Sequence, residues 1–548
     1  MRKSNALRPL RPRRPCRPRV FSASSWLRPL DWAVVAVYAG GLIILGVLAS
    51  RRRFAPVDYF LASRRTTWPV IGLSLLATNI SSTALVGLTG GAYSTGLSVY
   101  DYEWTATLVL VFFCLFLLPS IIRSRIYTVP EYLERRYDRR ARLLFALLTL
   151  FLNVVVDSAG VLYSGSLVCQ LLFPAWPLWI IVAVLAGAAG IYTITGGLRS
   201  VIYTEAVQAV VLLASAALIS AAAFHQAGGW HAVMSQVDPA ALSLIRPMGD
   251  RGVPWLGLLL GVPLLGFYYW CTNQSIVQRM LSAKNTDHAR WGALFAGLLK
   301  LTVLFLIVLP GTCALLLFPH LPRADLVYPN LILHLLPVGL AGLVVAAFVA
   351  ATIVSIASLL NSASTLITMD VVRHFRPNLT DDKMVRIGRI STALLLAIAV
   401  AWAPQLQLFP SLWQYLQAVL AYVVPPVVAL FVVGMCWRGA NADGAAATLV
   451  IGSVCGGAMF LANGILHWTH LHFLYAAPIL TLIDILILVG VSARSATLQR
   501  ASQMDAMSPQ LSWRIERAEL QTKPFWQDYR WQAAGLVLLT AAVVIAFR

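Results

Sequence analysis

Long apolar stretches recur along almost the whole chain and are separated by short polar segments. Each stretch is close to the roughly 20 residues that a helix needs to cross a hydrocarbon core of about 30 Å. The expected spans are residues 31–50, 67–97, 100–121, 143–172, 175–195, 201–224, 253–276, 291–318, 336–365, 389–408, 411–436, 444–464, 470–492 and 531–547. The pattern therefore predicts an all-α polytopic membrane protein with about fourteen transmembrane helices.

Two of the expected spans are interrupted by polar residues, glycine or proline. The second contains "ATNISSTALVGLTGG" (77–91), and the seventh contains Gly261, Pro263 and Gly266 within "GVPLLGFYYWCTNQS" (261–275). Glycine and proline weaken or free helical hydrogen bonds, which lipid tolerates where the freed groups line a cavity. A simple proline kink would give a similar pattern.

The positions of these two breaks suggest an internal repeat. They lie five spans apart, as expected for two five-helix repeats of inverted topology that each begin with a discontinuous helix. We predict the repeats at 67–224 and 253–436. The span at 31–50 and those within 444–548 would then be additions to the core.

One expected span carries a row of hydroxyl groups. In "FVAATIVSIASLLNSAS" (348–364), Thr352, Ser355, Ser358 and Ser362 lie on one helical face. Close packing of membrane helices explains such a face, because small hydroxyl residues let helices approach. The alternative is that these hydroxyls meet an ion at the first break.

Composition and charge support a membrane protein. Apolar residues make up 59% of the 548 residues and charged residues only 12%, with a mean hydropathy of +0.75. The formal charge of +20 resides largely in loops that fall on one side if fourteen spans alternate, so we assign that side to the cytoplasm and expect no nucleic-acid partner. Both termini are then expected outside, the basic residues 1–30 disordered, and 493–530 a cytoplasmic loop.

Several functional classes lack their sequence signals. The chain contains no Walker loop, no GxGxxG before a helix and no HExxH, and its seven cysteines show no metal spacing. ATP-driven transport has no support, and we expect no enzyme.

Ionisable and amide groups inside the spans are candidates for a solute site, because such groups are costly in lipid. They are Asp157, Glu103 and Lys300, with Gln417 in the eleventh span and Tyr269 and Trp270 beside the second break. Charged and amide groups next to aromatic faces suit a polyhydroxylated ligand. A purely structural pair of Glu103 and Lys300 is the alternative.

Several motifs together resemble the sodium/solute symporter family, specifically its sodium/glucose cotransporter branch. They are "YDYEWTA" (100–106), "RSRIYTVPEYLERRYDRRAR" (123–142), "YTITGGLRSVIYTEAVQ" (192–208), "YYWCTNQSIVQRMLSAK" (268–284), "LNSASTLITMDVV" (360–372) and "YLQAVLAYVVPP" (415–426). The resemblance covers about residues 31 to 548. It implies a LeuT-like core and sodium as the coupling ion.

The resemblance implies a sodium site built on the first break. Its members would be the carbonyl groups of Ala77, Ile80 and Ala351 and the hydroxyl of Ser355. Two positions depart from the pattern: Val354 replaces a serine of the bacterial sugar transporters, and Glu205 stands where an aspartate is usual.

The resemblance also implies a sugar site with gates. Asn79, Glu103, Lys300 and Gln417 match sugar-binding positions, Tyr269 matches the inner-gate tyrosine, and Tyr102 and Trp413 match outer-gate aromatics. Ala84 and Gly266 replace polar residues of the family, which leaves the preference among sugars open.

The sequence therefore predicts a symporter of the cell membrane that couples sodium to uptake of a hexose-like solute or polyol. A carboxylate or amino-acid substrate is disfavoured because Glu103 would repel it and no arginine is expected inside the spans. Proton coupling is an alternative motivated by Val354, Asp157 and Glu205. A sensor that kept the fold but lost transport is another.

Overall fold

The computed structural model describes most of the chain. The described residues are 28–50, 64–195, 198–250, 252–376, 378–409, 411–466, 468, 470–495 and 524–548. Most of the basic N-terminal segment, residues 1–27, and most of the expected cytoplasmic loop, residues 496–523, lie outside them.

The described residues form helices, and β-structure there is limited to isolated bridges. The helices of the first half are α1 (Pro29–Ser50), α3 (Trp68–Asn79), α4 (Ser82–Thr95), α5 (Asp101–Phe116), α6 (Leu118–Arg123), α7 (Val129–Arg136), α8 (Arg139–Leu152), α9 (Ala159–Leu172), α10 (Leu178–Thr195), α11 (Leu198–Gln226) and α12 (Gly229–Gln236). Those of the second half are α13 (Trp255–Leu260), α14 (Val262–Phe267), α15 (Gln274–Leu281), α16 (Thr286–Leu301), α17 (Leu309–Leu317), α18 (Val327–Leu335), α19 (Leu340–Leu366), α20 (Arg373–Phe375), α21 (Asp381–Trp402), α22 (Leu412–Val423), α23 (Pro425–Cys436), α24 (Ala442–Phe460), α25 (Phe473–Arg494) and α28 (Tyr529–Ala546).

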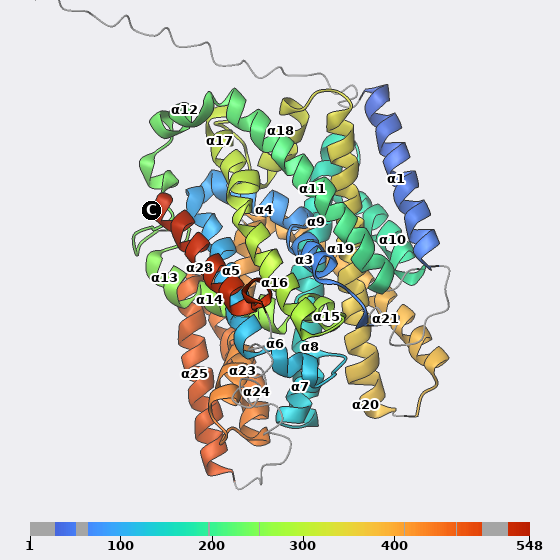
Figure 1. Cartoon of the computed structure of the whole chain (residues 1–548), viewed down its shortest axis with the longest axis vertical. Helices are drawn as coiled ribbons and strands as arrows, with labels where there is room; N and C mark the ends of the chain where they lie inside the picture. The colour runs from blue at the N-terminus through green and yellow to red at the C-terminus, as the bar shows by residue number, and fades with distance from the viewer. Residues whose placement is uncertain are drawn as a thin grey trace, which may run out of the picture.

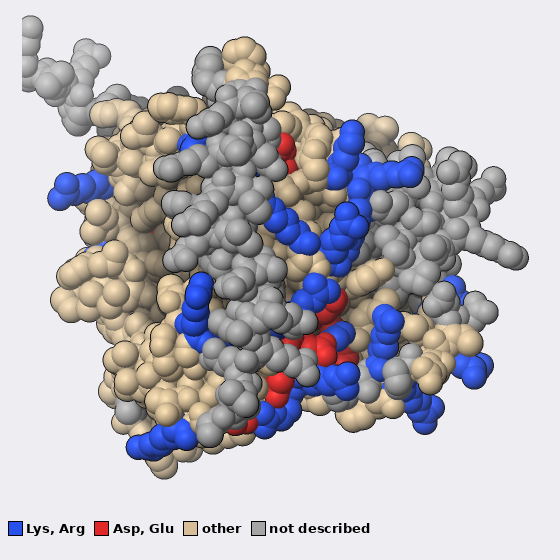
Figure 2. All heavy atoms as spheres, turned by 60° about the horizontal axis from the view of Figure 1, so that its bottom comes forward, with Lys and Arg blue, Asp and Glu red and all other residues tan. Residues whose placement is uncertain are grey.

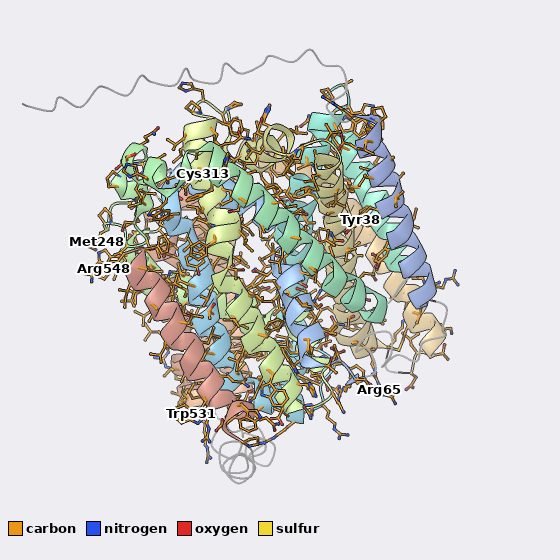
Figure 3. The ribbon with its side chains drawn as sticks, turned by 45° about the horizontal axis from the view of Figure 1, so that its top comes forward. Tyr38, Arg65, Met248, Cys313, Trp531 and Arg548 are labelled. Atoms are coloured by element: carbon orange, nitrogen blue, oxygen red, sulfur yellow. The ribbon has the colours of Figure 1, made fainter. Side chains whose placement is uncertain are left out.

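Within the described residues, nine helices are long and apolar enough to cross a membrane, or up to eleven if each of two bent pairs is one span. The all-α membrane class is confirmed, and the count of fourteen stays a prediction. Helices occupy every range in which a span is expected. Figure 1 shows them gathered into one bundle, with α1 and α28 on opposite flanks. Figure 3 shows the same arrangement from another side, with Tyr38 on one flank and Trp531 and Arg548 on the other.

The first helix break lies where the sequence predicts it. α3 ends at Asn79, Ile80 follows with φ −84° and ψ 60°, and α4 starts at Ser82 after the extended Ser81. The N–H of Ile80 donates to the Leu76 carbonyl, and the N–H of Leu85 donates to the Ser81 carbonyl. The carbonyls from Ala77 to Ile80 are therefore the last four of α3, which have no partner inside their own helix.

The second break lies later than the glycine and proline positions indicate. Pro263 falls in the first turn of α14, where its missing N–H removes no helical hydrogen bond. Gly261 instead permits close packing, since a Cβ there would lie 2.3 Å from the Leu474 carbonyl oxygen. The chain changes direction at Asn273, which has φ −66° and ψ 123°, between the π-helical turn η5 (Tyr268–Thr272) and α15.

A third interruption was not expected from the sequence. α22 and α23 meet at Val424 and are bent by 52°. Pro425 and Pro426 open α23, where their fixed φ suits the first helical turn. The bend turns α22, which carries Trp413 and Gln417, toward α4.

The core is built from helices of both expected repeats. α16 packs against α3 and α5, α11 packs against α3, and α19 packs against α9, α10 and α11. Figure 2 shows Lys and Arg side chains gathered on the bottom face of Figure 1, where α7 and α20 lie. Exposed basic residues of this region include Arg135, Arg139 and Arg373. A common basic face is what the topology prediction requires, and the orientation of the termini remains a prediction.

Candidate functional site

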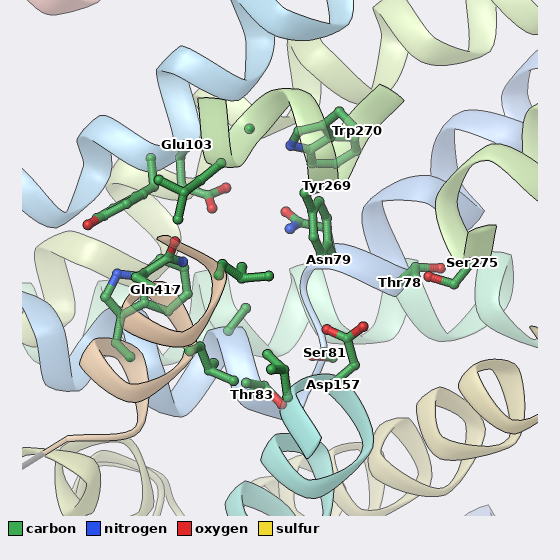
Figure 4. A pocket seen from close by; sticks show the side chains of 18 of the residues that line it. Thr78, Asn79, Ser81, Thr83, Glu103, Asp157, Tyr269, Trp270, Ser275 and Gln417 are labelled. Carbon is green, nitrogen blue, oxygen red and sulfur yellow. The ribbon is translucent and has the colours of Figure 1, made fainter. Parts of the chain in front are cut away.

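A cavity lies beside the first helix break and is surrounded by both halves of the chain. About 120 Å³ of it admits the centre of a water-sized molecule. Its polar or aromatic lining residues are Thr78, Asn79, Ser81, Thr83, Tyr102, Glu103, Asp157, Tyr269, Trp270, Ser275, Lys300, Ser355, Trp413 and Gln417. All the expected sugar and gate residues thus meet at one cavity. Figure 4 shows Glu103 and Gln417 on one side of it and Asn79, Tyr269 and Trp270 on the other.

Lys300 is the cation of this cavity and is fully buried. Its Nζ donates to Oδ1 of Asn79 at 2.6 Å and to Oε2 of Glu103 at 2.5 Å. The ammonium also lies 4.7 Å from the centre of the Trp270 ring, within range of a cation–π interaction. α5, α3 and α16 are therefore joined at one buried charge, and the charges of Lys300 and Glu103 balance.

Two pairs of aromatic rings line the cavity. The rings of Tyr102 and Trp413 meet edge to face with centroids 5.5 Å apart. Gly87 of α4 makes room for the indole, because a Cβ there would lie 3.0 Å from Cε3 of Trp413. On η5, the rings of Tyr269 and Trp270 also meet edge to face, at 5.3 Å.

The residues expected to bind sodium lie beside the break, although only one of them lines the cavity. Four carbonyl groups at the end of α3 have no hydrogen-bond partner within that helix, and those of Ala77 and Ile80 are the first and the last of them. Ser355 of α19 lines the cavity, and Ala351 is buried one turn away. Val354 is also buried, and its side chain adds no oxygen atom.

The hydroxyl face of α19 is divided among different neighbours. The Thr352 hydroxyl donates to the Phe348 carbonyl of its own helix at 3.0 Å. Its methyl group packs on α9, since a Cβ at Gly165 would lie 2.4 Å from Thr352 Cγ2. Thr352 therefore serves helix packing, while Ser355 faces the cavity.

Sequence reasoning missed a buried arginine next to this face. Arg279, which follows the seventh expected span, is 1% exposed. Its Nη2 donates to Oε1 of Glu205 at 2.6 Å, and its Nε donates to Oε2 of Glu205 and to Ser74, both at 3.1 Å. It also donates to the Ser358 hydroxyl and the Ser275 carbonyl.

Arg279 lies in α15, beyond the expected span 253–276 and beyond the candidate span Trp255–Thr272, so the expectation of no arginine inside the spans stays a prediction. The guanidinium joins α3, α11, α15 and α19 behind the expected sodium position. Glu205 supplies the balancing charge, which accounts for a carboxylate at this position. The sequence signal was weak: Arg279 sits among apolar residues in "SIVQRML", while its partner lies 74 residues away.

Comparison with solved structures shows the fold. A sodium-coupled sialic acid symporter in a substrate-bound outward-open state aligns with a TM-score of 0.75 at 22% identity, covering 86% of this chain and 98% of that one. Mhp1, a nucleobase-cation-symport-1 family transporter, aligns with a TM-score of 0.54 at 14% identity, covering 83% of this chain and 99% of that one. The described helices therefore adopt a LeuT-like transporter fold.

Relatives in sequence are more similar and cover most of the chain. A sodium/glucose cotransporter 4 from Danio rerio is 32% identical over 87% of this chain and 81% of its own length. A sodium/mannose cotransporter from Bos taurus is 34% identical over 82% of this chain and 81% of its own length. A sodium/myo-inositol cotransporter 2 from Oryctolagus cuniculus is 34% identical over 78% of this chain and 69% of its own length.

The sequence model of the Sodium:solute symporter family matches residues 59–452, which contain both helix breaks and every residue of the cavity described above. The match agrees with the resemblance carried by the sequence motifs. The chain is a transporter and not an enzyme, and it belongs to the Sodium:solute symporter family.

Proposed function

We propose that this chain couples inward movement of sodium to uptake of a neutral sugar or polyol, by alternating access around the cavity between α3, α5, α16 and α22. The relatives are sodium cotransporters of glucose, mannose and myo-inositol. These three solutes share a ring of hydroxyl groups and carry no charge. We therefore propose an uncharged ring that carries several hydroxyl groups as the substrate class.

The pairing of Lys300 with Glu103 carries this proposal. Since each charge satisfies the other, the pair offers hydrogen bonds to a neutral solute and no net charge to an ionic one. Asn79 and Gln417 add amides that both donate and accept, as sugar hydroxyls require. The Tyr269 ring adds a face for the C–H groups of a sugar ring.

For sodium, we propose the carbonyl oxygens of Ala77, Ile80 and Ala351 and the hydroxyl of Ser355. Carbonyl and hydroxyl oxygens are suitable ligands for a hard cation. Ser358 is an unfavourable replacement for the oxygen missing at Val354, because its hydroxyl accepts a hydrogen bond from Arg279.

The finer architecture belongs to the same proposal. The proposed architecture has about fourteen spans, with inverted repeats at 67–224 and 253–436. Its basic loops lie in the cytoplasm, and both termini lie outside the cell. Glu103 and Lys300 then lie on the second helix of each repeat, α5 and α16, so their ion pair joins equivalent elements.

Sodium coupling is energetically sufficient. A monovalent cation gains about 2.3 kcal/mol per 100 mV of membrane potential. A tenfold gradient adds about 1.4 kcal/mol, so one ion sustains roughly 500-fold accumulation of a neutral solute.

Uptake of labelled glucose, galactose, mannose and myo-inositol into proteoliposomes tests the proposal, with an inward sodium gradient compared with equimolar choline at fixed pH. We expect accumulation in sodium only, and its loss in Gln417→Ala. Gln414→Ala is the matched control, because Gln414 lies on the same helix but is exposed. Equal accumulation in choline, or no uptake of any of the four solutes, would contradict the proposal.

A further inference from the structure

The first N–H group of α3 is capped by a side chain of another helix. Thr67 stands at the N-cap position in an extended conformation, with φ −91° and ψ 158°, but its hydroxyl makes no capping hydrogen bond. The N–H of Trp68 instead donates to Nδ1 of His288, in the first turn of α16, at 3.2 Å. The first N–H groups of a helix have no partner within it, so His288 supplies a partner that the local sequence of α3 does not.

This hydrogen bond requires a neutral imidazole. Since the N–H of Trp68 is the donor, Nδ1 of His288 is the acceptor and carries no proton. A protonated ring has an N–H at both nitrogens, so it accepts no hydrogen bond. Histidine is the side chain whose charge ordinarily changes between about pH 5 and 8. His288 is only partly buried, so its ring can exchange protons with water.

His288 belongs to the face of α16 on which α3 packs. His288, Gly292 and Phe295 are spaced four and three residues apart, so they lie on one side of α16. A Cβ at Gly292 would lie 2.7 Å from Cγ2 of Ile71, and one at Gly72 would lie 2.5 Å from Cδ1 of Phe295. Figure 1 shows α3 and α16 side by side. The two helices are in close contact, and His288 lies where α3 begins.

The far end of α3 is held by the same helix. Lys300 of α16 donates to Oδ1 of Asn79, the last residue of α3, at 2.6 Å. The chain breaks at Ile80, so no continuous helix joins α3 to α4. The carbonyl groups of Ala77 and Ile80, which are proposed sodium ligands, lie at this end. Their positions therefore depend on the contacts that α3 makes with its neighbours.

Two charged side chains of opposite sign act on His288. They are Lys284, which precedes α16, and Asp287, which lies in its first turn. The ring of Trp291 meets the imidazole edge to face, with centroids 5.6 Å apart. Arg65, three residues before Trp68, is exposed. Lys284 and Asp287 oppose each other in their effect on the ring.

The helices packed against α16 add few further charges. These helices are α3, α5, α6, α15 and α28, and α3 carries no titratable side chain. The charged side chains on the other four are Asp101, Glu103, Arg123, Arg279 and Arg530. Glu103, Arg279 and Arg530 each form an ion pair with another residue. Tyrosine and cysteine side chains on these helices are neutral near pH 7.

We propose that His288 is a positioning residue that holds α3 in place for sodium binding, and that its protonation from the cytoplasmic side weakens sodium binding. This inference rests on the proposed sodium-coupled transport and topology, and it adds a pH response to them. Protonation at Nδ1 removes the acceptor of the Trp68 N–H. It also places a positive charge at the N-terminal end of α3, where the helix dipole is already positive.

The sign and size of the response follow from this contact. While the ring is neutral, His288 caps α3, and the carbonyl groups at the far end keep their positions. When the ring is protonated, α3 loses the cap and the proposed ligands lose part of their support. Loss of an N-cap corresponds to roughly a fivefold change in an equilibrium constant. Sodium affinity should therefore fall roughly fivefold when the pH is lowered through the range in which histidine titrates.

Equilibrium binding of ²²Na⁺ to the purified full chain, measured at about pH 8 and about pH 5.5, tests the proposal. We expect the wild type to bind sodium roughly fivefold more weakly at the lower pH. His288→Asn should bind sodium with nearly equal affinity at both pH values. The asparagine Oδ1 stands at the same bonded position as Nδ1 of histidine and accepts a hydrogen bond at either pH.

His334→Asn is the matched control. His334 is an exposed histidine on α18, and its ring lies 5.5 Å from that of Phe318. Because His334 does not cap α3, this variant should keep the pH dependence of the wild type.

Thr67→Asp gives a second test that leaves His288 in place. An aspartate at the N-cap accepts from N–H groups of the first turn and offsets a positive charge there. We expect the pH dependence of sodium binding to shrink to less than about twofold. This variant keeps the proposal testable if His288→Asn does not fold.

A sodium affinity of the wild type that does not change with pH would overturn the proposal. The full pH dependence of the wild type in folded His288→Asn or Thr67→Asp would also overturn it, as would its loss in His334→Asn. Absence of sodium binding by the wild type at both pH values would instead overturn the proposed function, so the two failures are distinguishable.

Discussion

Replacing Glu205 with glutamine removes the charge that balances Arg279 and should weaken sodium binding. Arg279 is 1% exposed and donates two hydrogen bonds to Glu205. It also donates to Ser358, which lies one helical turn from Ser355. In Glu205→Gln the guanidinium is therefore an unbalanced positive charge close to the proposed ion.

The size of this effect follows from the spacing on α19. Residues three apart on a helix have Cβ atoms about 5–6 Å apart, so the guanidinium and an ion at Ser355 are roughly 7 Å apart. Two unit charges at that distance repel by about 2.4 kcal/mol at an effective dielectric constant of about 20. That energy corresponds to roughly 50-fold weaker sodium binding. The unpaired charge should also destabilise the fold by about 3–5 kcal/mol.

The assay is the sodium concentration that gives half-maximal sugar uptake in proteoliposomes, measured beside the thermal stability of the purified protein. Glu205→Asp keeps the charge and should stay close to the wild type. The double variant Glu205→Gln with Arg279→Gln removes both charges and should recover most of the sodium affinity. A folded Glu205→Gln protein with unchanged sodium dependence would refute the reasoning.

Three further predictions concern α19 and its contacts. Ser355→Ala should raise the half-saturating sodium concentration about tenfold or more, because the ion loses one ligand. Thr352→Val is the control and should change that concentration little, because the Thr352 hydroxyl bonds to its own helix. Equal effects of the two variants on uptake would contradict the assignment. Val354→Ser adds an oxygen at the proposed site and should lower the half-saturating sodium concentration, and a higher value would count against the site. Gly165→Ala should lower the free energy of unfolding by about 1–3 kcal/mol, because the new Cβ would lie 2.4 Å from Thr352 Cγ2. A thermal melt measures this change, and an unchanged melting temperature would show that the contact is loose.

The sequence predicted the all-α class and the first helix break because both depend on local information. Hydropathy over about 20 residues identifies a span, and the polar cluster around Asn79 identifies an interruption near the bilayer centre. The motifs identified the family, and the residues matched to the sugar positions meet at one cavity. Their roles in binding stay predictions.

The parts that sequence reasoning missed depend on partners far along the chain. Arg279 has the appearance of a loop residue until Glu205, 74 positions earlier, is placed beside it. Gly261 suggests a break, yet it serves contact with Leu474 of a distant helix. The break at Asn273 contains neither glycine nor proline, since an asparagine cap alone starts α15 there. Pairings of this kind cannot be read from one segment.

The hydroxyl face of α19 shows how one regular pattern acquires several roles. A helix of 27 residues is about 40 Å long at 1.5 Å per residue, so successive turns of one face meet different neighbours. Thr352 meets α9, Ser355 meets the cavity, and Ser358 meets Arg279. The Oγ of Ser362 has no hydrogen-bond partner within the described residues. Of these four hydroxyls, only Ser355 lines the cavity, so the proposed sodium ion must take most of its ligands from backbone carbonyls. Such a site depends on the exact position of α3, and the Arg279–Glu205 pair fixes that position through Ser74.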